Sequence, residues 1–413
     1  MMLTGPVLGT VLQLASASTQ LFSPLIPQKV LATFNALPTP VKYPQYTDTT
    51  TGKWQYFTPW TWTSGFFPVT GYALNTRKSL CGGTLANGLG VADWLALGRS
   101  ASTGLIGLDA SHGIGHDVGF LSFPFVEELA VNPTNATAIA AINRFATALA
   151  NRFNAKVGCT RSWDTVDPTD FPVIIDNMMN IEVLFHSAAL TGNVTLKNIA
   201  ISHADTTMLN HIRPDGSTWH VVEYNTTTGN VIKKRTQQGY SDTSTWARGQ
   251  AWAIYGFANM YRFTGDGNYL ATSRRLATYF LRNLPADGIV PWDFNAPLAP
   301  APRPADSSAA TVAATALLLL ARSESTPAAA KPWSDAAIQI LNNITALAWR
   351  PSWQSLLANG TVNMPANNSL TGIVYGTNSP FLRVTGRLDA YLGDYYYIKA
   401  GNDLISMSLA RCT

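Results

Sequence analysis

Two short segments of the chain, Leu190-Thr191-Gly192-Asn193 and Phe263-Thr264-Gly265-Asp266, share one pattern, and the second follows the first after 73 residues. Apolar residues at helical spacing lie on both sides of each segment. In both, the glycine stands where the end of a helix needs a residue in the left-handed conformation. Each segment is therefore expected to end one helix and to start the next, so the chain contains a repeated helical hairpin.

Helical periodicity extends well beyond these two segments, and convincing alternating strands are scarce. Helical hairpins repeated over about 400 residues close most naturally into a toroid, with inner helices round an axis and loops gathered at one mouth. The functional site is expected in that mouth. The predicted helices cover residues 139–153, 178–190, 196–211, 246–263, 269–284, 307–322 and 336–349.

The composition favours one large buried core. Hydrophobic residues make up 46% of the 413, and charged residues only 13%, against about 25% in an average soluble protein. No Gly/Ser linker or charge run divides the chain, so residues 19–413 are expected to form a single domain, as a monomer or weak dimer. The net charge of +4 comes from scattered basic residues, so nucleic acid is not an expected partner.

No membrane anchor is expected in the mature chain, because the richest apolar run, residues 309–321, is shorter than the roughly 18 residues that a spanning helix needs. Residues 1–18 resemble a weak signal peptide, with an apolar centre and then Ala15-Ser16-Ala17, although no Lys or Arg precedes them. Secretion is also favoured by six possible N-glycosylation sites. They are Asn135, Asn193, Asn225, Asn343, Asn359 and Asn367.

The three cysteines, Cys81, Cys159 and Cys412, lie far apart in the sequence. They are too few for a zinc ribbon or a disulfide scaffold, but they allow one disulfide bond with one thiol left over. Most of the stability is therefore expected to come from packing.

The helix that begins near Trp246 contains two locally unfavourable residues, and such residues tend to mark functional sites. Arg248 places a cation in the first turn, where the helix dipole favours anions, and Gly249 costs about 1 kcal/mol relative to alanine. Arg248 and Trp252 are four residues apart and share a face, which suits a sugar ring bearing a carboxylate. The structural alternative is an arginine stacked on a core tryptophan.

Two aspartates are candidate catalytic acids. Asp176 follows the apolar Val173-Ile174-Ile175, so burial is expected to raise its pKa and to suit it to proton transfer. Its alternative role is that of a helix cap. Asp117 lies among glycines that let the backbone approach a ligand closely, and its alternative role is that of a turn aspartate.

The histidines are less informative. His220 follows a glycine turn in a polar, aromatic stretch, and a hydrogen-bonded structural role competes with a catalytic one. His112 and His116 have the His-x-x-x-His spacing of a zinc site, but glycines between them disfavour a helix and no glutamate follows His112. A metal hydrolase is therefore a remote alternative. Many of the twelve tryptophans stand beside polar residues, as in clefts that stack on sugars.

Together these segments resemble the unsaturated glucuronyl hydrolases, glycoside hydrolase family 88. The resemblance extends over roughly residues 110 to 400, and the matching pieces occur in the family's order. A lone Trp-x-Arg-Gly-Gln would be weak evidence, whereas the whole series is specific. The matching pieces are residues 116–120, 176–180, 215–220, 246–252, 292–294, 306–310 and 393–397.

The resemblance implies an (α/α)6 barrel that removes a 4,5-unsaturated uronic acid from the non-reducing end of oligosaccharides left by polysaccharide lyases. It implies no metal or cofactor. Carried over by motif, Asp176 is the general acid and base, and Asp117 is the second essential carboxylate. The residues implied to line the unsaturated sugar are His220, Gln238, Arg248, Trp252 and, less directly, Trp163.

This sequence departs from the family in two places. No family motif is evident before about residue 80, and residues 375–392 do not clearly show the Ser- and Lys-bearing loop that binds sulfate in some members. Two further functions stay open: the related unsaturated rhamnogalacturonyl hydrolases of family 105, and a sugar-binding toroid without activity. Gln250-Ala251 after Arg248-Gly249 favours family 88, and the presence of both aspartates favours an enzyme.

Overall fold

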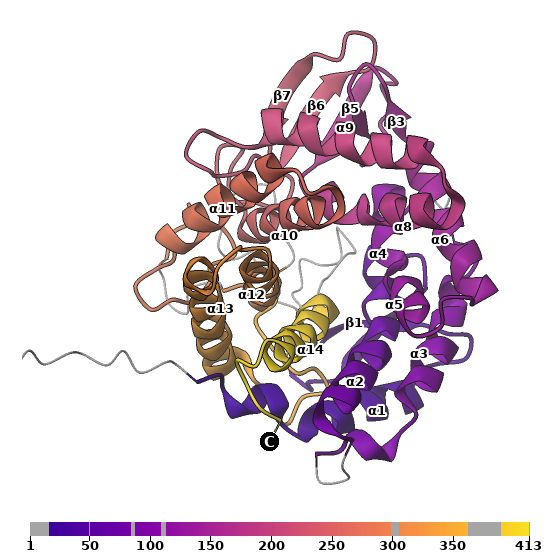
Figure 1. The fold of residues 1–413 in the computed structure, drawn as a ribbon, viewed down its shortest axis with the longest axis vertical. Coiled ribbons are helices and arrows are strands. Elements are labelled where there is room, and N and C mark those ends of the chain that lie inside the picture. Colours follow the sequence, from indigo (N-terminus) through magenta and orange to yellow (C-terminus); the bar gives the residue numbers. More distant parts are fainter. Residues whose placement is uncertain are drawn as a thin grey trace, which may run out of the picture.

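The computed structural model describes residues 16–48, 50–83, 87–108, 113–298, 305–361 and 390–412. Its helices form a closed ring in two layers (Figure 1). In the described part of the chain, six helical segments form the inner layer, and each lies against the next around the ring. They are α2 (Pro68–Cys81), α4 with α5 (Val118–Leu121 and Phe123–Val131), α7 with α8 (Asn177–Asn180 and Glu182–Thr191), α10 (Ala247–Thr264), α12 (Ser307–Arg322) and α14 (Ala390–Ser406).

The outer layer consists of helices that alternate with the inner ones along the chain. The inner helices α10 and α12 are buried on nearly all sides, as expected for helices that are apolar all round. By contrast, α11 buries one face and exposes the other. The outer helices are α1 (Leu25–Asn35), α3 (Trp94–Ser102), α6 (Ala136–Ala150), α9 (Val194–His211), α11 (Gly267–Arg282) and α13 (Pro327–Ala348). This alternation is the expected (α/α)6 barrel.

The ring closes where α14 meets α2. Arg77 of α2 is buried there, and its guanidinium donates to the carbonyl oxygens of Leu21 (2.9 Å) and Ile398 (2.7 Å) and to the side chain of Asn402 (2.8 Å). A disulfide bond between Cys81 and Cys412 joins the same two ends of the chain. Covalent and polar contacts thus tie the N-terminal and C-terminal parts into one ring.

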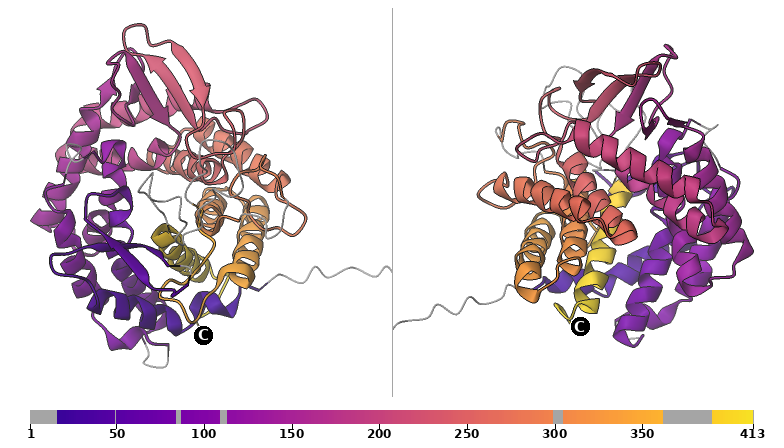
Figure 2. Two further views of the ribbon diagram at one scale, coloured as in Figure 1. Left: turned by 180° about the vertical axis from the view of Figure 1, so that it is seen from behind. Right: turned by 45° about the horizontal axis from the view of Figure 1, so that its top comes forward.

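In the described residues, three small antiparallel sheets lie in the connections, and the sequence pattern did not reveal them. The largest consists of β5 (Asp170–Ile174), β6 (Val221–Asn225) and β7 (Val231–Arg235) in that order. It lies outside the ring beside α9 (Figures 1 and 2). The other two pair β1 (Tyr43–Thr47) with β2 (Trp54–Phe57), and β3 (Phe153–Asn154) with β4 (Cys159–Thr160).

The two segments that predicted the hairpins behave as expected. Gly192 and Gly265 end α8 and α10 in the left-handed conformation, with φ of 72° and 73°. The side chains of Asn193 and Asp266 then accept a backbone N–H in the first turns of α9 and α11. All seven predicted segments are helical, but two of the predictions need correction. Residues 178–190 form two helices, α7 and α8, divided at Ile181, and 336–349 is only the second half of a longer helix, α13, which contains Pro332.

Among the described residues, no helix combines the length and the apolar character needed to cross a bilayer.

Candidate active site

Asp117 and Asp176 occupy equivalent positions, each directly before an inner helix. Asp117 precedes α4 and Asp176 precedes α7, but neither carboxylate caps its helix with a hydrogen bond. The structural alternative for Asp176, a capping aspartate, is therefore wrong. Both residues are largely buried, at 7% and 9% exposure. Two buried carboxyl groups that do not cap a helix are a candidate catalytic pair.

A close contact between α4 and α7 brings the two aspartates together. A Cβ atom on Gly119 would lie 2.4 Å from the Cα of Asn180, so the helices could not approach so closely with any side chain at this position. The side-chain oxygen of Asn180 also accepts the backbone N–H of Phe120 at 2.8 Å. Close packing and a hydrogen bond therefore hold the motifs 116–120 and 176–180 together.

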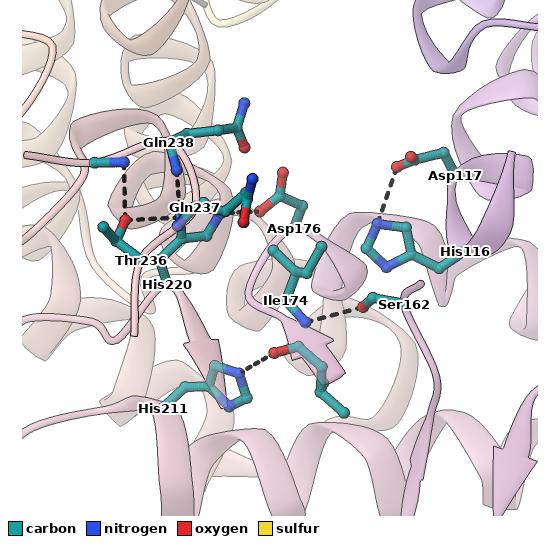
Figure 3. A network of polar contacts seen from close by, with 12 residues as sticks. His116, Asp117, Ser162, Ile174, Asp176, His211, His220, Thr236, Gln237 and Gln238 are labelled. Carbon is teal, nitrogen blue, oxygen red and sulfur yellow. Dashed lines mark hydrogen bonds and ion pairs between the residues drawn. The ribbon is translucent and has the colours of Figure 1, made fainter. Parts of the chain in front are cut away.

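Burial raises the pKa of Asp176 to about 6, and the negative charge of Asp117 contributes to the rise. His116 and Arg248 act in the opposite direction. In Figure 3, His220 lies on one side of the Asp176 carboxyl group, and the pair His116 and Asp117 lies on the other. The sequence-based expectation that burial and Asp117 both raise this pKa agrees with the arrangement.

His220 presents an N–H group to Asp176. Its Nδ1 accepts the backbone N–H groups of Gln237 (3.2 Å) and Gln238 (3.4 Å), so Nδ1 carries no proton and the proton lies on Nε2. Nε2 is 3.9 Å from Oδ1 of Asp176. Burial holds the pKa of His220 well below its usual value, and Arg235 and Arg248 lower it further. The ring is therefore a neutral donor that faces the carboxyl group.

Asp117 is held by its neighbour in the sequence, since Oδ1 lies 3.0 Å from Nε2 of the buried His116. The backbone N–H of His116 donates to the carbonyl oxygen of Ser162 at 3.2 Å. Oγ of Ser162 accepts the backbone N–H of Ile174, two residues before Asp176, at 2.9 Å. Ser162 thus connects the loops of both aspartates, and no sequence motif had identified it.

Gln238 lies in a loop that folds back onto His220. Oγ1 of Thr236 accepts the backbone N–H of Gly239 at 2.8 Å, and the buried Asp293 accepts the backbone N–H of Tyr240 at 2.9 Å. Figure 3 shows the Gln238 side chain on the same side of the site as His220. His220 and Gln238, both expected to line the sugar, are thus brought together.

Arg248 is fully buried, and its positive charge acts on Asp176. Its Nη1 lies 3.1 Å from Oδ2 of Asp306, and it also donates to Oγ of Ser308. Asp306 uses its other oxygen to cap α12, where Oδ1 accepts the N–H groups of Ser308 and Ala309. Charge pairing across two inner helices explains a cation in the first turn of α10.

The expected pairing of Arg248 with Trp252 is wrong. The guanidinium carbon lies 4.6 Å from the ring centre of Trp246 instead. Trp252 faces the barrel axis, where its ring packs against Phe120 (5.4 Å) and Tyr396 (5.6 Å). Trp252 lies one helical turn beyond Arg248, as expected. The ring that lies against the guanidinium, however, belongs to Trp246, the residue directly before α10.

Trp163 is half-buried, and the Arg235 guanidinium lies 5.9 Å from the centre of its ring. Trp252 and Arg248 expose no surface in the structure. Direct contact of these three side chains with a sugar therefore stays a prediction.

The remote alternative, a metal held by His112 and His116, involves a residue outside the described part of the chain. That residue is His112, and Nε2 of His116 contacts Asp117. In the described part of the chain, no three His, Cys, Asp or Glu side chains are grouped so that they could hold a metal ion.

The fold and the site define a class: an (α/α)6-barrel enzyme with a buried acid directly before an inner helix. The chain is 37% identical to an unsaturated glucuronyl hydrolase of Formosa agariphila over 349 residues, which cover 82% of this chain and 78% of the relative. It is 36% identical to an unsaturated glucuronyl hydrolase of a Bacillus species over 50% of this chain and 55% of that protein. No family model matches the sequence.

Solved structures agree with these relatives. The crystal structure of an unsaturated glucuronyl hydrolase specific for heparin is similar with a TM-score of 0.79 and 27% identity, over 96% of this chain and 98% of that one. The Bacillus enzyme's crystal structure is similar with a TM-score of 0.73 and 26% identity, over 92% and 94% of the two chains. The protein belongs to the unsaturated glucuronyl hydrolase family, glycoside hydrolase family 88.

Proposed function

We propose that this protein releases a 4,5-unsaturated uronic acid from the non-reducing end of lyase-generated oligosaccharides by hydrating the C4=C5 double bond. The observation that carries the proposal is Asp176, a buried carboxyl group whose pKa is raised to about 6 beside a neutral histidine donor and a second carboxylate. The names of the relatives support the same activity.

The substrate is an enol ether conjugated with a carboxylate, and its hydration needs a proton at C4 and a water oxygen at C5. Asp176 begins protonated and gives its proton to C4, so the double bond opens and positive charge develops at C5 and the ring oxygen. The resulting carboxylate then takes a proton from the water that attacks C5. The product is a hemiketal, which opens and expels the next sugar. The carboxylate-spacing rule for ordinary glycosidases does not apply to this chemistry.

Each neighbouring residue has a role in this scheme. The Nε2–H of His220 faces the charge that Asp176 acquires when it loses its proton, and so stabilises the deprotonated state. Asp117, fixed by His116, keeps the pKa of Asp176 high and accepts a hydrogen bond from a sugar hydroxyl. Gln238 adds an amide that can bind the same sugar, and the half-buried Trp163 adds a ring. Arg248 and Trp252, which expose no surface, support this binding set from within the barrel.

The decisive experiment is a panel of lyase digests from pectin, gellan, glucuronan and chondroitin, with the loss of ultraviolet absorbance as the readout. At least one digest should lose the absorbance of its conjugated double bond, and heat-denatured protein should leave all of them unchanged. No loss with any digest would contradict the proposal. The pattern across the panel identifies the leaving sugar and any preference for sulfate.

We further propose that the mature protein is a secreted glycoprotein whose residues 19–413 form a single catalytic domain. The Cys81–Cys412 disulfide bond suits an oxidising compartment, and the sequon residue Asn193 is exposed at the start of α9. Contacts between α2 and α14 close the ring within one chain. The barrel therefore needs no second subunit, and we expect a monomer or weak dimer. These points can be tested on protein expressed in a eukaryotic host. A mobility shift on deglycosylation tests glycosylation, N-terminal sequencing tests cleavage of the signal peptide, and sedimentation tests the oligomeric state. Cytoplasmic, unmodified protein would refute secretion.

A further inference from the structure

A second cavity lies among the inner helices, and none of the side chains of the proposed active site lines it. Its volume is 530 Å³, and residues of α5, α8, α10 and α14 line it. Tyr255 and Arg262 of its wall follow Arg248 in α10 by seven and fourteen residues, which places them about 10 Å and 21 Å further along the helix. The cavity therefore belongs to the opposite end of the ring.

A layer of aromatic rings separates the two sites. Phe120 lies 5.3 Å from Phe66 and 5.4 Å from Trp252, measured between ring centres. Tyr396 lies 5.6 Å from Trp252 and reaches the second cavity on its other side. A ligand in this cavity would not share the active-site pocket.

The wall of the cavity is rich in tyrosine. Tyr255, Tyr395 and Tyr396 all line it, with ring centres 4.9 Å apart for Tyr395 and Tyr396 and 6.1 Å apart for Tyr255 and Tyr396. Phe123 stands beside them, 6.4 Å from Tyr395. Clustered aromatic rings with a nearby carboxylate are the chemistry by which proteins bind organic ammonium ions.

The nearby carboxylate is Glu127, and no side chain among the described residues forms a hydrogen bond or an ion pair with it. Burial raises its pKa, and the negative charges of Glu182 and Asp403 raise it further, against Lys399. A cation in the cavity would relieve this cost.

The other charges of the wall already have partners. Glu182 accepts hydrogen bonds from Arg262 and Asn259, each at 2.8 Å, and Nζ of Lys399 contacts Asp403 at 3.1 Å. His186 lies against Glu182 at 3.3 Å. Among the described residues, Glu127 is therefore the one charged side chain of the wall that has neither a hydrogen bond nor an ion pair.

We propose that this cavity binds a small organic cation with a methylated or quaternary ammonium group, which Glu127 and the rings of Tyr255, Tyr395 and Tyr396 would surround. The proposal does not depend on the proposed enzymatic activity, because the aromatic layer separates the two sites.

The test is calorimetric titration of the full protein at neutral pH with choline and with its uncharged isostere, 3,3-dimethylbutan-1-ol. Choline should bind saturably and at least about tenfold more tightly than the isostere. Glu127→Gln should weaken choline binding about tenfold, while the exposed control Asp335→Asn should not change it. Absence of choline binding, equal binding of the two compounds, or full affinity in Glu127→Gln would each overturn the proposal.

A second pair of variants distinguishes the contribution of the Tyr255 ring to choline binding from that of its hydroxyl group. Tyr255→Leu should weaken choline binding severalfold, whereas Tyr255→Phe should leave it nearly unchanged because the ring face remains. Equal losses in both variants would contradict an aromatic cage. The rate on an unsaturated uronide, measured in Glu127→Gln, should stay near that of the wild type, and circular dichroism confirms that each variant is folded.

Discussion

Gly119 packs against Asn180 so closely that a Cβ atom on the glycine would lie 2.4 Å from the asparagine Cα. This contact joins the helix that follows Asp117 to the helix that follows Asp176. The spacing of the two carboxyl groups therefore depends on a residue with no side chain. Gly119→Ala should separate α4 from α7, lower stability by about 1–3 kcal/mol and reduce activity more than tenfold.

Denaturant unfolding and initial rates measure these two effects. Gly267→Ala is the matched control, because Gly267 has open space around its Cβ position and lies in the first turn of α11. That variant should be neutral or slightly more stable. A Gly119→Ala protein with normal stability and rate would show that the close contact is not needed.

Asp176→Asn should abolish turnover, with a loss of at least about 10³-fold, because the amide cannot donate and then accept the proton. The fold should persist, since the carboxyl group caps no helix. Loss of ultraviolet absorbance reports the rate, and circular dichroism reports the fold. Asp164→Asn, at an exposed carboxylate, is the control. A near-normal rate in Asp176→Asn would remove this residue from its proposed role.

The pH dependence follows from the raised pKa of Asp176. The protonated carboxyl group starts the reaction, and its pKa is about 6. The value of kcat/KM should therefore be level below about pH 6 and fall about tenfold per unit above it. Rates between about pH 5 and 8 test this, with circular dichroism at each pH as a control. A rate that rises with pH across this range would contradict a protonated Asp176.

The buried pair of Arg248 and Asp306 should matter strongly for stability. Both side chains are fully buried, so Asp306→Asn removes a buried counter-charge of Arg248 and should cost about 3–5 kcal/mol. Asp335→Asn, which breaks an exposed pair with Lys331, should cost less than about 1 kcal/mol. Denaturant unfolding measures both. Similar small losses in the two variants would contradict the buried pairing.

The disulfide bond predicts a specific response to reductant. Cys81 and Cys412 are bonded across 331 residues, so reduction should lower the free energy of unfolding by about 2–5 kcal/mol. A Cys81→Ser, Cys412→Ser double variant should have the same lower stability with and without reductant. Burial raises the pKa of the Cys159 thiol to about 12. Thiol reagents should therefore not modify the native protein, and after denaturation without reductant they should modify Cys159 alone. A reactive thiol in the native protein would contradict this arrangement.

The hairpin repeat could be predicted from the sequence alone, because Gly192 and Gly265 carry a local conformational preference that needs no tertiary partner. The sequence also identified both aspartates, since apolar neighbours mark Asp176 and glycines mark Asp117. The small sheets escaped prediction, because strands as short as β3 and β4 have too few residues to show an alternating pattern.

The contacts of these residues could be found only in the folded chain. The structure assigned the disulfide to Cys81 and Cys412, turned Arg248 onto Trp246 and Asp306 rather than Trp252, and made Ser162 the link between the aspartate loops. Such contacts join residues tens to hundreds of positions apart, and their free energies depend on distances that no local preference encodes. The second cavity, too, could be found only in the folded chain, because helices far apart in the sequence form its wall around Glu127.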